Sequence, residues 1–65
     1  MRIELNGRAI ETKAGTLAEL LEEQGIDAGC VASALNGTFV PRERYASQLL
    51  KANCRLEVLS PMQGG

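Results

Sequence analysis

The sequence contains no histidine and no tryptophan, and only two cysteines, Cys30 and Cys54, among its 65 residues. Without histidine, neither a Ser-His-Asp nor a Cys-His catalytic set can form. Two thiolates alone cannot complete a tetrahedral zinc site or hold an iron–sulfur cluster, so we expect no metal site. We expect both cysteines to be reduced and packed as small apolar side chains. The functional alternative is a thiol that meets a sulfur donor, which nothing in their spacing supports.

Charge and aromatic content are also low. Seven basic residues stand against eight acidic ones, for a net charge of −1, with one Phe and one Tyr. This balance argues against a nucleic-acid-binding surface, which normally carries a basic excess and aromatic platforms. No apolar run approaches the roughly 20 residues of a membrane span, and the first residues lack the apolar core of a signal peptide. We therefore expect a cytoplasmic protein that binds neither nucleic acid nor membrane.

Nucleotide-binding loops are missing as well. The chain has neither the Gly-x-x-x-x-Gly-Lys-Ser/Thr loop nor the Gly-x-Gly-x-x-Gly loop, so we expect it to bind no nucleotide on its own. Glu43 and Glu57 are isolated carboxylates rather than a recognisable acid–base pair. We expect no catalytic residues and no cofactor, and therefore no enzyme activity of the chain alone.

The first part of the chain has the pattern of a β-hairpin. Residues 2–6 alternate between polar and apolar side chains, as a half-buried strand does. Asn6 and Gly7 follow, and this pair readily adopts the positive φ angles of a two-residue type I′ turn. The pairs that this register predicts are Leu5 with Arg8, Ile3 with Ile10, Met1 with Thr12 and Arg2 with Glu11.

A short amphipathic helix is expected next, over about residues 17–24. Thr16 and Glu19 form a capping box, with Thr16 as the N-cap. Gly25 follows the last periodic residue, where a left-handed C-cap is favoured. The residues that share the apolar face are Leu17, Leu20 and Leu21. The opposite face is acidic; it is most simply solvated, although it could also dock a basic partner.

The remaining elements complete a sheet. The sequence predicts a strand at 31–35 and a brief return strand at Phe39-Val40 that ends at Pro41. A turn or single helical turn is expected at 42–46, followed by core positions at Leu49 and Leu50. The final strand is expected at 55–60. This order predicts a two-layer α+β domain over residues 1–60, with the last strand in the centre of the sheet beside the first. Residues 61–65 are expected to form a flexible tail that projects from this strand.

The tail, Pro61-Met62-Gln63-Gly64-Gly65, offers a terminal carboxylate. A frayed end without function is one interpretation. The other is that the carboxylate of Gly65, ionised at neutral pH, is the functional group and is activated with ATP by a partner. Gly64 and Gly65 lack Cβ atoms, so an extended tail could thread a narrow channel, with Met62 and Gln63 at its mouth. Met62 could equally be a stray exposed apolar residue.

The combined pattern resembles the ThiS family of small sulfur carriers of thiamine biosynthesis. The matching segments are Leu35-Asn36-Gly37-Thr38-Phe39-Val40-Pro41-Arg42, Tyr45-Ala46, Arg55-Leu56-Glu57-Val58, the helix from Thr16 and the terminal Gly-Gly. The resemblance covers essentially the whole chain. It implies a β-grasp, ubiquitin-like fold, with a mixed sheet of four to five strands packed by one main helix. Asn53-Cys54 departs from the Gly-Asp that usually precedes the final strand in this family.

The resemblance also implies a mechanism. An adenylating enzyme of the ubiquitin-activating type would join AMP to the carboxylate of Gly65, and Gly64 would be its required neighbour. Sulfur drawn from cysteine by a donor of the cysteine desulfurase type would then give a thiocarboxylate, for delivery to thiazole synthase. Leu59 and Phe39, with Val58 and Met62, are candidates for an apolar partner-docking patch near the tail, although some of these must be core.

Three alternatives remain open on the sequence alone. The small sulfur-carrier subunit of molybdopterin synthase shares the expected fold and the Gly-Gly end. A ubiquitin-like modifier that is conjugated to lysines would need the same tail. A β-grasp domain could also be a plain binding module whose last residues have no function.

Overall fold

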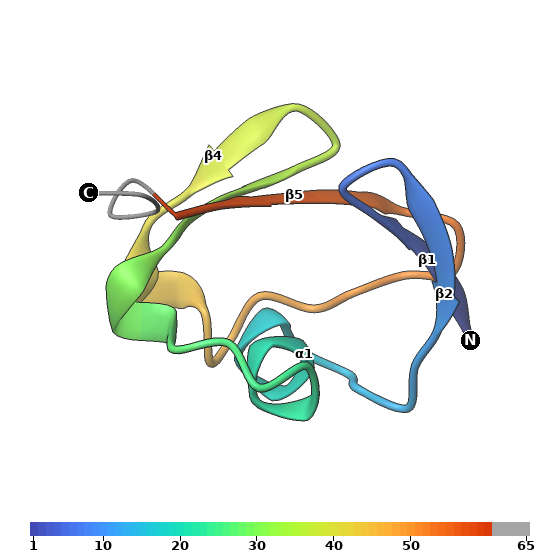
Figure 1. Cartoon of the computed structure of the whole chain (residues 1–65), viewed down its shortest axis with the longest axis horizontal. Helices are drawn as coiled ribbons and strands as arrows, with labels where there is room; N and C mark the ends of the chain where they lie inside the picture. Colours follow the sequence, from blue (N-terminus) through green and yellow to red (C-terminus); the bar gives the residue numbers. More distant parts are fainter. Residues whose placement is uncertain (61–65) are drawn as a thin grey trace.

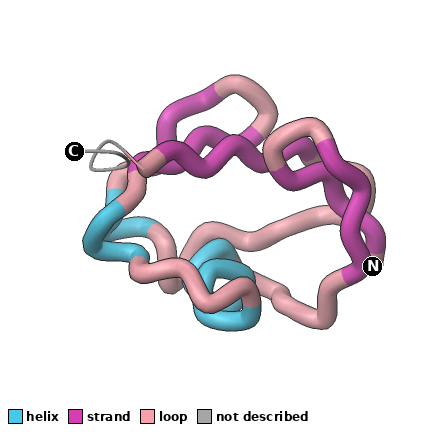
Figure 2. Tube along the Cα trace, viewed as in Figure 1, coloured by secondary structure: helices cyan, strands magenta, loops and turns pink. Residues whose placement is uncertain are grey.

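The computed structural model describes residues 1–60 of the chain, which form a five-stranded sheet with one α-helix packed across one of its faces (Figure 1). The strands are β1 (Arg2–Leu5), β2 (Arg8–Glu11), β3 (Ala32–Leu35), β4 (Thr38–Val40) and β5 (Arg55–Leu59); the helix is α1 (Leu17–Glu23), and two 3₁₀ turns are η1 (Ala28–Cys30) and η2 (Arg42–Arg44). Figure 2 shows the strands as one layer and α1 as the other. The predicted α+β class is confirmed.

The β1–β2 hairpin has the predicted turn and register. Asn6 and Gly7 have φ angles of 51° and 83°, which are the positive values that a type I′ turn needs. Ile3 lies opposite Ile10, and the backbone of Met1 exchanges two hydrogen bonds with that of Thr12, at 2.8 and 2.9 Å. The local turn therefore sets which side chains of both strands face the core.

Helix α1 begins at the predicted capping box. The hydroxyl of Thr16 accepts from the backbone N–H of Glu19 at 3.2 Å, and the Glu19 carboxylate accepts from the backbone N–H of Thr16 at 3.2 Å. The helix ends at Glu23, one residue earlier than expected, and Gly25 follows in the left-handed region with φ 72°. The side chains that α1 buries are Leu17, Leu20 and Leu21, as predicted.

Strand β5 lies in the centre of the sheet, whose order is β2-β1-β5-β3-β4. It runs parallel to β1 and antiparallel to β3. Its residues alternate, so that Leu56 and Val58 are buried in the core with the leucines of α1, while Glu57 and Leu59 are exposed on the other face. The prediction of a central last strand beside the first is confirmed, and β5 is held by neighbours on both sides.

Several predicted details are wrong. Leu50 is a core residue, but Leu49 is 65% exposed. Leu49 pairs with Thr16 in an isolated antiparallel bridge, and successive residues of such an extended segment point to opposite sides, so only Leu50 can face the core. The predicted strands shift by one residue at one end. By contrast, the turn expected over 42–46 is present, with η2 at 42–44 and turn residues at 45–47. The sequence did not predict η1, which Asp27 caps through the N–H of Gly29 at 2.9 Å.

Candidate functional site: the open face of the sheet at the end of β5

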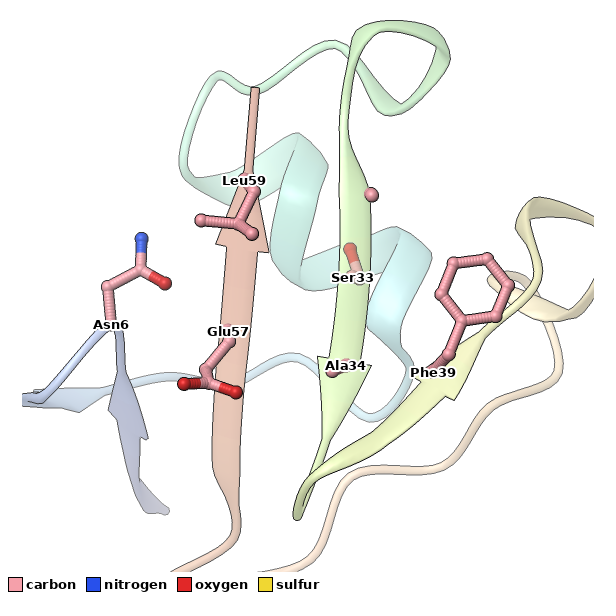
Figure 3. Close-up of a pocket in the computed structure, with 7 residues that line it drawn as sticks. Asn6, Ser33, Ala34, Phe39, Glu57 and Leu59 are labelled. Carbon is pink, nitrogen blue, oxygen red and sulfur yellow. The ribbon is translucent and has the colours of Figure 1, made fainter. Parts of the chain in front are cut away.

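The face of the sheet away from α1 carries a shallow groove of about 410 Å³ beside the end of β5 (Figure 3). We call it the β5 groove. It is lined by Asn6, Ala32, Ser33, Ala34, Phe39, Glu57 and Leu59. The chain leaves β5 after Leu59, so the groove adjoins the point from which residues 61–65 continue.

The groove follows from the register of three strands. Ala34 of β3 pairs with Glu57 of β5 on one side and with Phe39 of β4 on the other, and Ala32 pairs with Leu59. Side chains at paired positions lie on the same face of the sheet. Because the alanines are short, the larger side chains on either side rise above them and leave a channel along β3.

Two large apolar side chains form the walls of the groove. Phe39 is 65% exposed and Leu59 is 68% exposed. Figure 3 shows them on opposite sides of β3. Exposed apolar surface that is gathered in a hollow, rather than scattered, is typical of a site that another protein covers. Glu57 also lines the groove, and within residues 1–60 it forms no ion pair, so this apolar surface carries one negative charge.

The structure brings together two of the residues that the sequence marked for docking, Phe39 and Leu59. Val58, the third, is 8% exposed and belongs to the core, because it alternates with Leu59 along β5. The remaining predicted positions, Met62, Gln63, Gly64 and Gly65, lie outside the described residues. Sequence reasoning missed the floor of the groove, because alanines give no signal until the strands on either side are known.

The two cysteines differ. Cys54 is buried, as predicted, but the prediction that Cys30 is packed is wrong. Cys30 ends η1 at the surface, where its thiol lies 3.4 Å from a carboxylate oxygen of Asp27. The hydrogen bond to this carboxylate raises the pKa of the Cys30 thiol. The pKa of Asp27 is lowered, mainly by the hydrogen bond from the N–H of Gly29 and to a lesser extent by that from the Cys30 thiol. Cys30 is therefore protonated at neutral pH and a poor nucleophile.

No three histidine, cysteine, aspartate or glutamate side chains of residues 1–60 are grouped so as to hold a metal ion. No helix in the same residues is long and apolar enough to span a membrane.

A mixed sheet with a central last strand, covered on one face by a single helix after an N-terminal hairpin, defines a β-grasp, ubiquitin-like protein. The ThiS family model matches residues 3–65, and the chain belongs to the ThiS family.

Solved structures of similar proteins agree with this membership. The crystal structure of the thiamine biosynthesis protein (ThiS) from Geobacter metallireducens has a TM-score of 0.86 and 28% sequence identity, over 100% of both chains. The NMR solution structure of a thiamine biosynthesis protein from Geobacter metallireducens has a TM-score of 0.80 and 28% identity, over 100% of this chain and 88% of that one. Among curated proteins, no sequence matches this chain.

Proposed function

We propose that the chain is a cytoplasmic sulfur carrier protein of thiamine biosynthesis, without a cofactor or enzyme activity of its own. The observation that carries this proposal is the family match, which extends over residues 3–65 and so includes the terminal Gly64-Gly65. The similarity in fold and sequence to a thiamine biosynthesis protein over the full length of both chains supports the same pathway.

The chemistry would take place at the carboxylate of Gly65. This group is ionised at neutral pH and resists nucleophiles, because its carbonyl carbon is electron-rich. Attack of a carboxylate oxygen on the α-phosphate of ATP, catalysed by a ubiquitin-activating-type enzyme, releases pyrophosphate and gives an acyl adenylate. A persulfide sulfur from a donor of the cysteine desulfurase type then displaces AMP. Cleavage of the sulfur–sulfur bond by a thiol leaves the thiocarboxylate, which thiazole synthase consumes.

The fold is consistent with a domain whose role is to present its C-terminal tail to partner enzymes. β5 is bonded to β1 on one side and to β3 on the other, so the tail starts from a strand that is fixed within the sheet. Gly64 and Gly65 have no Cβ atoms, which suits passage of the tail into a narrow channel of a partner, with Gln63 and Met62 following at its mouth. The partner enzymes supply every catalytic group in this scheme.

We also propose that the β5 groove docks the adenylating enzyme. Phe39→Ser and Leu59→Ser are each expected to weaken binding of that enzyme about tenfold or more, because each removes an apolar wall of the groove. Both side chains are mostly exposed, so the free energy of unfolding should change by less than about 0.5 kcal/mol. Calorimetric titration of the enzyme with each variant measures the first quantity, and urea unfolding the second.

Leu49→Ser is the matched control for these substitutions. Leu49 is as exposed as Phe39, at 65%, but it does not line the groove. Its replacement is expected to leave the affinity within about twofold of the original. Equal losses in all three variants would show a non-specific effect of surface polarity, and unchanged affinity in all three would place the docking surface elsewhere.

Genetic rescue tests the pathway. The chain is expected to restore growth without thiamine to a strain that lacks its own thiamine sulfur carrier, and not to restore molybdoenzyme activity to a strain that lacks the small subunit of molybdopterin synthase. The opposite pattern would assign the chain to molybdopterin synthesis. Failure in both strains, with the protein present at normal levels, would count against either carrier role.

A further inference from the structure

Asn6 does more than form the turn of the β1–β2 hairpin. Its side-chain carboxamide makes two hydrogen bonds to the backbone of Val58 in β5, which is 52 positions away in the sequence. The Val58 N–H donates to Oδ1 of Asn6 at 2.8 Å, and Nδ2 of Asn6 donates to the Val58 carbonyl at 3.1 Å. Both polar groups of one β5 peptide position are therefore satisfied by one side chain.

These bonds continue the ladder between β1 and β5. The N–H of Glu4 donates to the carbonyl of Cys54 and the N–H of Asn6 donates to the carbonyl of Leu56, each at 2.9 Å. Each step advances two residues on both strands, so Val58 is the next position in line. There the backbone of β1 has already turned away, with Asn6 at φ 51°. A carboxamide offers the same donor and acceptor as a peptide group, and the Asn6 side chain takes its place.

Asn36 provides a natural comparison, because it starts an equivalent Asn-Gly turn between β3 and β4 with the same φ of 51°. Its Oδ1 accepts from the N–H of Arg55 at 2.8 Å, and its backbone N–H donates to the carbonyl of Arg55 at 2.7 Å. Asn36 thus binds Arg55, the first residue of β5, whereas Asn6 binds Val58, the residue before the last one of β5. Figure 3 shows Asn6 beside β5 on the edge of the β5 groove.

We propose that Asn6 is a positioning residue that fixes the direction in which the chain leaves β5. Within the described residues, β1 pairs with β5 only as far as Leu56, while β3 pairs with it as far as Leu59. Without the carboxamide, the end of β5 would be held from one side only. This inference rests on the proposed function, in which the chain beyond Ser60 leads to the carboxylate that is activated. The direction matters because the reacting carbon must reach the active site of the enzyme in a narrow range of geometries.

The test compares Asn6→Gly with Asn36→Gly in the full chain. Glycine accepts the positive φ of both turns, so each variant keeps its hairpin and loses only side-chain bonds to β5. Amide hydrogen exchange followed by NMR should be about tenfold faster or more at Val58 in Asn6→Gly, with Arg55 unchanged. Asn36→Gly should show the reverse pattern. Asn6→Asp keeps an acceptor for the Val58 N–H but has no donor for its carbonyl, and should give intermediate exchange at Val58.

Activity is then measured with an adenylating enzyme of the ubiquitin-activating type, by pyrophosphate release below the melting temperatures of all variants. Asn6→Gly should lower kcat about fivefold or more, and Asn6→Asp should recover part of the loss. Asn6 lies at the edge of the β5 groove, but the apolar walls Phe39 and Leu59 remain, so KM should rise by a smaller factor than kcat falls. Asn36→Gly should stay within about twofold of the original kcat. Equal kcat losses in both glycine variants, or unchanged Val58 exchange in Asn6→Gly, would overturn the assignment.

Failure of the proposed function would look different. If the unaltered chain releases no pyrophosphate with the enzyme, the carrier role is contradicted, whereas the exchange pattern still decides whether Asn6 holds the end of β5. Selective loosening of Val58 would then support the mechanical role of Asn6 without the carrier chemistry. Uniformly faster exchange along the whole of β5 would show that Asn6 only stabilises the fold and would contradict the positioning role.

Discussion

Deletion of Gly65 is expected to abolish the conversion of the chain to a thiocarboxylate while leaving its melting temperature unchanged. The deletion moves the terminal carboxylate back by one residue, roughly 3.5 Å along an extended chain. A displacement of even about 1 Å at a reacting centre can cost a hundredfold in rate. Within residues 1–60, the core cluster extends from Ile3 to Val58, and the deletion removes none of these residues. Intact-mass spectrometry after incubation with the activating enzymes measures the conversion, and thermal unfolding measures the stability.

Gly65→Ala is the companion variant, because it restores the length of the tail and adds one methyl group. We expect it to be converted slowly, since the added Cβ narrows the fit of the tail in a channel. A deletion variant that is still converted at the original rate would show that Gly65 is not the modified residue. A deletion variant that unfolds would show that the last residue has a structural role, and would contradict the claim that the domain only presents the tail.

The second large expected effect is the loss of stability when a core leucine of α1 is truncated. Leu20→Ala is expected to lower the free energy of unfolding by about 2–5 kcal/mol, because it leaves a cavity in the centre of the core. Leu20 is 0% exposed and packs on the helical face that covers the sheet. A chain of this length is expected to be stable by only roughly 3–10 kcal/mol in total. The variant should therefore be largely unfolded in mild urea, as circular dichroism would show.

Leu49→Ala provides the same change of side chain at a surface position. Since Leu49 is 65% exposed, its truncation should cost less than about 0.5 kcal/mol. If Leu49→Ala proved as destabilising as Leu20→Ala, the assignment of Leu49 to the surface and of Leu20 to the centre of the core would be wrong.

Features that depend on neighbours in the sequence were predicted well. Asn6-Gly7 determines the turn, and the turn determines the register of both strands, so the hairpin pairs could be named from the sequence. The capping box of α1 is equally local, since Thr16 and Glu19 are three residues apart. The alternation along β5 shows which of its residues reach the core. Its place in the centre of the sheet was predicted from the order of the elements.

Features that depend on distant segments were missed. Leu49 follows the same apolar pattern as Leu50, and only its bridge to Thr16 turns it towards solvent. Cys30 was missed for a different reason, because η1 is a local element whose cap by Asp27 is too short a signal to separate from a loop. The hydrogen bonds of Asn6 to Val58 join the two ends of the chain, and nothing near Asn6 in the sequence indicates them.

The candidate site was predicted only in part for the same reason. Phe39 and Leu59 stood out because they are large apolar residues that were expected to lie near the tail. The groove between them exists because Ala32 and Ala34 pair with strands on either side, and that arrangement follows from the sheet order rather than from any one segment.

The central claim, that Gly65 carries sulfur, is tested most directly by the mass of the intact protein. The chain is incubated with an adenylating enzyme, MgATP, a cysteine desulfurase, cysteine and a thiol reductant, beside a carrier that the same enzymes are known to convert. We predict that a fraction of the chain gains the mass difference between sulfur and oxygen, only when ATP is present, and that fragmentation assigns the gain to Gly65. An unchanged mass, with the tail intact and the reference carrier converted, would contradict the claim.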